Sequence, residues 1–202
     1  MEDTQRSTVR VDAQRNRQRL IEAARRAFAT GEGKVSLEAV AREAGVGIGT
    51  LYRHFPTREA LVEAVYRAER GRLCEAAAEL LAEQPPDRAL RGWMDRFADY
   101  VATKREMAEA LRTLIASGTI TKSEARQELS AAIQPLLDAG AASGTLRADV
   151  RAEDVVVGVV GIFSVCVFPE QRDQASRLLD LLMDGLRRTD AAPIPHREPA
   201  AP

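Results

Sequence analysis

One short segment, residues 47–54, concentrates side chains that can hydrogen-bond to a partner. If it is helical, its outer face carries Gly47, Ile48, Thr50, Tyr52, Arg53 and His54. Hydroxyl, guanidinium and imidazole groups at this spacing suit contact with the base edges and phosphates of DNA. An ordinary helical hairpin with a solvated outer face fits the same spacing. The spacing by itself therefore favours neither interpretation.

Two short helices joined by a tight turn, over residues 36–55, would position this face. Ala41, Gly45 and Leu51 stand at relative positions one, five and eleven. A small residue at Ala41 allows a close helix crossing, and Gly45 can adopt the positive φ that ends the first helix. Ser36 suits the N-cap. The inner face would consist of Leu37, Val40, Val46, Leu51 and Phe55. Such a helix-turn-helix places its second helix in the major groove.

The run Ala44–Leu61, which contains Leu-Tyr-Arg-His-Phe-Pro-Thr-Arg-Glu, resembles the signature of the tetracycline-repressor (TetR) family. Leu20–Phe28 resembles that family's first helix, so the resemblance covers roughly residues 13–66. It implies an all-α fold, in which a three-helix DNA-binding head precedes a helical-bundle body for ligand binding and dimerisation. The chain has Gly47 where the family often has Ser, and Gly47 offers no hydroxyl to a phosphate.

The resemblance also implies a homodimer that binds a palindromic operator in double-stranded DNA. The expected DNA-binding residues are Ser36, Gly47, Ile48, Gly49, Thr50, Tyr52, Arg53, His54, Thr57 and Arg58. Thr50 and Tyr52 are the best candidates for contact in the groove. Arg58 would anchor the DNA backbone or, alternatively, form an ion pair with Glu59 or Glu63.

Arginines outside these contacts leave two questions open. Arg53 could bind a guanine or a phosphate. Arg15, Arg17 and Arg19 lie near the start of the first helix, where they could meet phosphates.

Charge is distributed unevenly along the 202 residues, although the net charge is only −1. Residues 1–71 carry 13 Lys and Arg against 10 Asp and Glu, whereas residues 72–202 carry 16 against 20. A basic first third suits phosphate contact, and the acidic remainder would be kept away from DNA. Aromatic residues make up only 4% of the chain, which favours helices over strands.

Composition argues against several other classes of protein. Of the two histidines, His54 lies in the expected DNA-contacting helix and His196 near the end of the chain, so we expect no enzyme, no cofactor and no metal site. Cys74 and Cys166 show no ligand spacing and suit a reducing cytoplasm. The longest apolar run, Val155–Phe168, is too short to span a membrane. We therefore expect a cytoplasmic protein.

Four regions are expected along the chain: a disordered arm over 1–11, a helix-turn-helix domain over 12–66, a ligand-binding and dimerisation domain over 67–190, and a disordered tail over 191–202. A helix from residue 58 to about 83, capped by Thr57, would connect head and body. Asp87 would cap the next helix, and Thr121 a later one.

Aromatic residues at helical spacing mark a candidate cavity in the body. The expected ligand-binding residues are Trp93, Phe97, Tyr100, Met107, Leu111 and Phe163. Most such stripes are core, so each aromatic is also a candidate core residue. Because few charged residues interrupt the apolar faces, we expect a small-molecule effector that is hydrophobic or weakly polar.

The end of the body suggests a dimer interface. Val155–Val160 has strand propensity, but nothing else in the chain resembles a strand that could pair with it, so we predict a helix. The last helix is apolar over an arc wider than one core needs, which fits pairing with a second copy. The expected interface residues are Val155, Gly158, Ile162, Leu178, Leu182 and Leu186.

Two further functions fit the sequence. One is a structural or nucleoid-associated DNA-binding protein without an effector, and the other is an interaction protein that has lost DNA binding. The resemblance alone favours a repressor over an activator.

Overall fold

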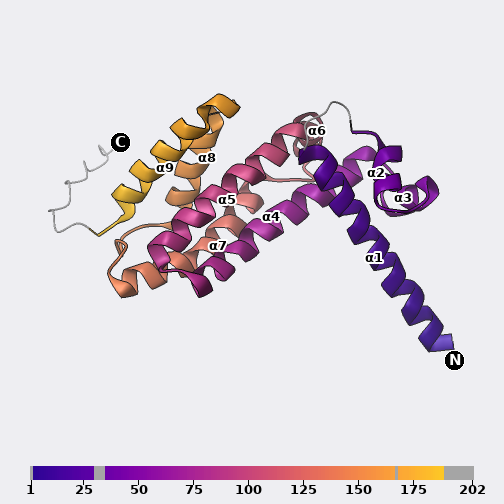
Figure 1. Ribbon diagram of the computed structural model, residues 1–202, viewed down its shortest axis with the longest axis horizontal. Coiled ribbons are helices and arrows are strands. Elements are labelled where there is room, and N and C mark those ends of the chain that lie inside the picture. Colours follow the sequence, from indigo (N-terminus) through magenta and orange to yellow (C-terminus); the bar gives the residue numbers. More distant parts are fainter. Residues whose placement is uncertain (1, 30–34, 167, 189–202) are drawn as a thin grey trace, which may run out of the picture.

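The computed structural model describes residues 2–29, 35–166 and 168–188 (Figure 1). The predicted all-α fold is confirmed, since the one pairing of β type in this part of the chain is an isolated bridge between Leu146 and Arg187. The elements are α1 (Glu2–Ala29), α2 (Leu37–Glu43), α3 (Ile48–His54), α4 (Arg58–Glu83), α5 (Pro86–Glu106), α6 (Ala108–Ala116), α7 (Lys122–Ser143), α8 (Ala152–Val165), the short 3-10 helix η1 (Pro169–Gln171) and α9 (Arg172–Leu186).

Helices α1, α2 and α3 pack with the start of α4 around one apolar core. Leu20, Val40, Leu51 and Leu61, one from each helix, are fully buried. Phe28 closes the core from α1 and is 2% exposed. The apolar faces predicted from the helical period are therefore the faces that meet.

Helix α1 is longer than predicted. The expected disordered arm over residues 1–11 is wrong for residues 2–11, which continue α1 without a break. Neither glycine nor proline occurs between Glu2 and Ala29, and extending an existing helix adds hydrogen bonds without a new nucleus. Figure 1 shows this end of α1 projecting beyond the head. The expected tail over residues 191–202 lies outside the described residues.

Three of the predicted helix caps, Ser36, Thr57 and Thr121, are confirmed and one is wrong. The Thr57 hydroxyl accepts from the Ala60 N–H at 3.1 Å, and the Thr121 hydroxyl accepts from the Glu124 N–H at 3.3 Å. Asp87 does not cap α5, which begins one residue earlier at Pro86. Proline fits the first position of a helix because no N–H is needed there.

The body surrounds α4, which packs against α5 and α7, while α8 and α9 pack together beside them. Trp93 of α5 is fully buried, and its indole N–H donates to the Leu73 carbonyl of α4 at 2.9 Å. The segment with strand propensity is helical, as predicted, and forms α8. Figure 1 shows the α8–α9 pair and the α2–α3 unit on opposite sides of this bundle.

Helix α4 belongs to both the head and the body. Its bounds agree with the predicted helix from residue 58 to about 83. The expected domain boundary, between residues 66 and 67, falls inside this helix. One continuous helix, with no loop or linker, therefore connects the head to the body.

Candidate nucleic-acid interface and ligand cavity

The turn between α2 and α3 depends on Gly45, whose φ is 66°. Its N–H donates to the Arg42 carbonyl, and the Val46 N–H donates to the Ala41 carbonyl, both at 3.0 Å. This pair of bonds is a Schellman motif, which ends a helix with a left-handed residue. The predicted role of Gly45 is confirmed.

Helix α3 buries one side and presents the other to solvent. Leu51 is fully buried, whereas Ile48 and Tyr52 are 38% and 46% exposed. Ile48 and Tyr52 are four residues apart and so lie on the same face, whereas the half-buried Thr50 lies on another side of the helix, where its hydroxyl accepts from Arg53. His54 is half-buried at the end of α3. The outer face of α3 thus combines an apolar group with hydroxyl groups.

Arg53 lies along its own helix. Its Nε donates to the Gly49 carbonyl at 3.2 Å, and its Nη2 donates to the Thr50 hydroxyl at 3.3 Å. Both hydrogen bonds are exposed to solvent. The guanidinium can therefore exchange them for stronger, charge-assisted bonds to a phosphate or a base edge.

Two exposed cations from α1 flank the α2–α3 unit. The Arg17 guanidinium carbon lies 5.2 Å from the centroid of the Phe55 ring. Arg19 covers Gly45 so closely that a Cβ added there would stand 2.5 Å from its Nη2. Both side chains bring positive charge to the turn and to the end of α3, where phosphates would pass.

Three of the expected DNA-binding residues have structural contacts inside the head. The Ser36 hydroxyl caps α2, accepting from the Ala39 N–H at 3.3 Å, and donates to Glu38 at 2.7 Å, which lowers the pKa of that carboxyl. Thr57 caps α4. The Arg58 Nη1 donates to the Val35 carbonyl at 2.6 Å, and Arg58 forms no ion pair with Glu59 or Glu63; its contact with the DNA backbone stays a prediction.

Helices α1 and α4 are joined by a cluster of charged side chains that sequence reasoning missed. Glu22 of α1 pairs with Arg25, at 2.6 Å, and with Arg72 of α4. Arg25 in turn lies 3.8 Å from Glu69 of α4. The hydrogen bond from Arg25 is the main cause that lowers the pKa of Glu22 to about 2, whereas burial raises the pKa of Glu69. The cluster therefore connects α1 to α4 through two interhelical ion pairs, Arg25–Glu69 and Arg72–Glu22.

A cavity of about 540 Å³ opens in the body between helices α4, α5, α6, α7 and α8. Of the residues expected to bind a ligand, Phe97, Tyr100, Leu111 and Phe163 line it. Trp93 and Met107 do not, because both are buried in the core, where Trp93 bonds to α4. The helical period identified the apolar face of α5, but it did not separate the residues that line the cavity from those packed beside it.

Aromatic rings in mutual contact form one wall of the cavity. The centroid of Phe97 lies 5.5 Å from that of Tyr100 and 5.8 Å from that of Phe163. Tyr66 of α4 adds a fourth ring, 6.1 Å from Tyr100. Burial, together with the neighbouring Tyr66 hydroxyl, raises the pKa of Tyr100 far above its usual range. Tyr100 is therefore neutral and gives the cavity a polar but uncharged hydroxyl.

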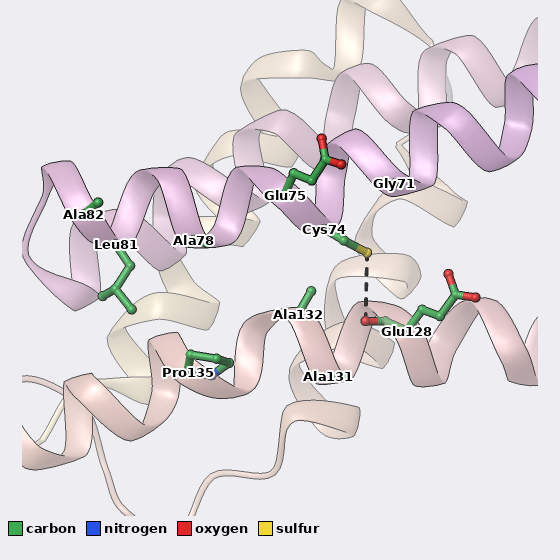
Figure 2. Close-up of a pocket in the computed structure, with 10 residues that line it drawn as sticks. All are labelled: Gly71, Cys74, Glu75, Ala78, Leu81, Ala82, Glu128, Ala131, Ala132 and Pro135. Carbon is green, nitrogen blue, oxygen red and sulfur yellow. Dashed lines mark hydrogen bonds between the residues drawn. The ribbon is translucent and has the colours of Figure 1, made fainter. Parts of the chain in front are cut away.

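A second hollow, lined by α4 and α7, differs from this cavity in its lining residues and in its charge (Figure 2). It is an open groove of about 840 Å³, and four of its ten lining residues are alanines, with Gly71 and Pro135 beside them. Its charged residues are Glu75 and Glu128. The Cys74 thiol donates to the Glu128 carbonyl at 3.9 Å, and burial raises the thiol pKa. The groove offers little apolar depth and no cation to a ligand.

The expected dimer interface needs correction. Val155 and Leu186 are buried inside the protomer, and Gly158 packs against Leu182, whose Cδ2 would lie 3.4 Å from a Cβ added at the glycine. Ile162 and Leu182 pack against the core, and Leu178 is half-buried. The exposed large apolar residues near this end are Val157, Val160, Val165, Phe168 and Leu181. Burial within the protomer therefore argues against Val155 and Leu186 as interface residues, while the partly buried Gly158, Ile162, Leu178 and Leu182 stay predictions.

No helix among the described residues is long and apolar enough to cross a membrane. In the same part of the chain, His, Cys, Asp and Glu do not gather in any group that could hold a metal ion.

Comparison with known proteins identifies both parts of the chain. Residues 20–65 match the family of bacterial regulatory proteins called the tetR family, and residues 85–188 match the C-terminal domain described as transcriptional regulator SbtR-like. An HTH-type transcriptional regulator of Staphylococcus aureus is 44% identical over 54 residues, which make up 26% of this chain and 29% of that protein. The chain thus matches less than a third of the length of this curated relative.

Two solved structures extend the similarity to nearly the whole chain. A TetR transcriptional regulator from Streptomyces coelicolor is 51% identical, with a TM-score of 0.76 over 86% of this chain and 99% of that chain. A TetR transcription regulatory protein from Mycobacterium vanbaalenii is 33% identical, with a TM-score of 0.69 over 89% and 99%. The exposed α3, the helix α4 shared with the body and these matches lead to one conclusion: the chain belongs to the TetR family of DNA-binding transcriptional regulators.

Proposed function

We propose that the protein is a homodimeric repressor that binds a palindromic operator and is released from it by a small-molecule effector. The observation that carries this proposal is the solvent side of α3, where Ile48, Tyr52 and Arg53 are exposed and Thr50 is half-buried, while Leu51 is buried in the core of the head. Hydroxyl groups there suit base edges, and Ile48 suits the methyl group of thymine. Arg17 and Arg19 would meet phosphates beside this face.

Dimerisation is supported by apolar surface on α8 and α9. Val157 of α8 is 46% exposed, and Leu181 of α9 is 67% exposed. A two-fold axis beside these helices would bury the same residues from both copies in a four-helix bundle. Each subunit would then bind one half-site, with the half-sites about one DNA turn, roughly 34–36 Å, or slightly more apart.

Release by an effector is supported by the position of α4. Tyr66 of α4 lines the cavity, while Leu61, five residues earlier, is buried in the core of the head. A ligand that prefers one orientation of α4 would therefore bias the spacing of the two heads. A difference in ligand affinity of about 1–3 kcal/mol between the two states changes operator affinity usefully.

The test is selection of binding sites from a pool of random DNA duplexes by the full-length protein, followed by titration of the selected duplex with single variants. We expect one enriched palindrome. Arg53→Ala should weaken binding at least about fivefold, since one good base contact is worth about 1–3 kcal/mol. Arg177→Ala removes the same charge from α9, where the side chain is exposed, and should change affinity less than about twofold.

A third variant tests the dimer. Leu181→Asp should yield monomers in sedimentation experiments and weaken operator binding, while binding to a single half-site stays unchanged. Selection of many unrelated sequences would favour the structural DNA-binding alternative. Absence of binding to any duplex would contradict the proposal and favour a protein that has lost DNA binding.

A further inference from the structure

The lining of the body cavity has an apolar part and a basic part. Its wall is aromatic and aliphatic, whereas its polar edge carries five basic residues: Lys104, Arg105, Arg112, Lys122 and Arg126. The lining includes no Asp or Glu. Residues 72–202 as a whole carry more acidic than basic residues, so this basic edge has the opposite sign of charge to the surrounding domain.

We infer that the ligand of this cavity is an amphipathic anion, with an apolar body on the aromatic wall and an anionic group, a carboxylate or a phosphate, at the basic edge. The inference rests on the proposed role of the cavity as the effector site. It replaces the hydrophobic or weakly polar ligand expected from the sequence. The sequence did not suggest an anionic ligand because the cations lie on three separate helices, α5, α6 and α7, which only the fold brings together.

The cations come from α5, α6 and α7, and three exposed ones, on α6 and α7, have no carboxylate partner in the part of the chain that the structure describes. Arg112, Lys122 and Arg126 each form no ion pair there. By contrast, Arg70, beside the cavity, is held by Glu128 at 2.7 Å, and Arg91 by Asp180 at 2.8 Å. The charges of Arg112, Lys122 and Arg126 are therefore available to a ligand, whereas those of Arg70 and Arg91 are paired with carboxylates.

The surroundings of the edge add to its positive potential. Lys122 is the first residue of α7, and a helix N-terminus carries partial positive charge. The nearest carboxylate on that turn, Glu124, accepts a hydrogen bond from the Thr121 hydroxyl at 3.5 Å and does not line the cavity. The Lys104 ammonium lies 6.0 Å from the centroid of Tyr66, so it also faces the aromatic wall.

Exposure of the edge makes an anionic ligand physically reasonable. Arg112, Lys122 and Arg126 are exposed, so an anion paired with them keeps part of its hydration and avoids the cost of burying a charge. The apolar body, in contrast, would leave water for a cavity whose size is typical of small-molecule sites. Exposed ion pairs are individually weak, so we expect several cations to act together.

The experiment compares three probes that share one tail and differ in charge: decanoate, 1-decanol and decyltrimethylammonium. Binding to the full-length protein is followed by the fluorescence of Trp93, the single tryptophan, which lies 5.6 Å from the Phe97 ring of the cavity wall, and by calorimetry. We expect decanoate to bind at least about tenfold more tightly than decanol, and the ammonium compound to bind least. Decyl phosphate then distinguishes the two anionic groups, and tighter binding of either one supports the inference.

Paired variants locate the charge. Arg112→Gln/Arg126→Gln should lower decanoate affinity at least about fivefold and leave decanol affinity unchanged. Arg172→Gln/Arg177→Gln, the matched control on α9, should change neither. Equal or tighter binding of decanol, or an equal loss for both probes in the double variant, would overturn the anionic ligand while leaving a ligand-binding body intact. If no probe binds, the inference falls together with the effector role of the cavity, and operator binding is unaffected.

Discussion

The head and the body use their interiors in opposite ways. In the head, the core beneath α3 is filled, and the residues that would touch DNA stand on its surface within one helix. In the body, a cavity of about 540 Å³ interrupts the packing, and its lining comes from five helices. Exposed residues of α3 such as Tyr52 can therefore change with little loss of stability, whereas in the body a residue such as Phe97 both lines the cavity and belongs to the core.

The largest expected effect tests this difference directly. Phe97→Ala removes a ring that contacts Trp93, Tyr100 and Phe163, and should lower the free energy of unfolding by about 3–5 kcal/mol. Tyr52→Ala, on α3, should change it by less than about 0.5 kcal/mol. Urea unfolding at one protein concentration measures both. A cost below about 1 kcal/mol at Phe97 would mean that the cavity wall contributes little to the core.

A second experiment asks how much of the head depends on a single backbone conformation. Gly45→Ala places a side chain at φ 66° and against Arg19, so it should cost about 1–2 kcal/mol. Gly49→Ala is the matched control within α3, where a Cβ meets no atom within 4 Å. It should stabilise the head by about 0.5–1 kcal/mol, because alanine favours a helix. Thermal unfolding gives both values, and equal effects would refute the role assigned to the turn.

The smallest expected effect concerns the charge cluster that joins head to body. The folded pKa of Glu22, about 2, is below its ordinary value of 4.5. Its contribution to stability is therefore fully present above about pH 4.5 and is lost as the pH falls toward 2. Glu22→Gln should cost about 1 kcal/mol at neutral pH, since solvent screens this partly exposed site. Between pH 5 and 3, the variant should lose stability less steeply than the parent protein.

The control for this variant is Glu79→Gln, which removes one partner of an exposed ion pair with Arg96. It should change stability by no more than a few tenths of a kcal/mol. Equal pH profiles for Glu22→Gln and the parent would show that the cluster does not stabilise the junction of α1 and α4.

Local features could be predicted from the sequence because each depends on a few neighbouring residues. Ser36, Gly45, Thr57 and Thr121 act within one turn of the helix that each begins or ends, and all four were predicted correctly. The helical state of the segment beginning at Val155 followed from the lack of a partner strand. The same reasoning failed for α1, because composition does not reveal how far a helix extends beyond its packed portion.

Features made by several helices could not be predicted. Apolar spacing identifies a buried side of each helix but not what that side meets, so Val155 was placed in an interface although it is buried within the protomer. Arg58 was given two possible partners near it in sequence, whereas it bonds to Val35, which precedes α2. The basic edge of the cavity depends on the crossing of α5, α6 and α7 and has no signal in any one of them.

The continuity of α4 has a consequence for the construction of hybrid regulators. A fusion that joins a foreign body after residue 66 would cut α4 in its middle and separate Glu22 and Arg25 of the head from their partners Arg72 and Glu69. A junction at Gln84, where α4 ends, keeps these contacts. The new body must then pack against the α4 surface of this protein. The transferable module therefore extends to residue 83, and interchange of bodies depends on whether the second half of α4 is compatible with them.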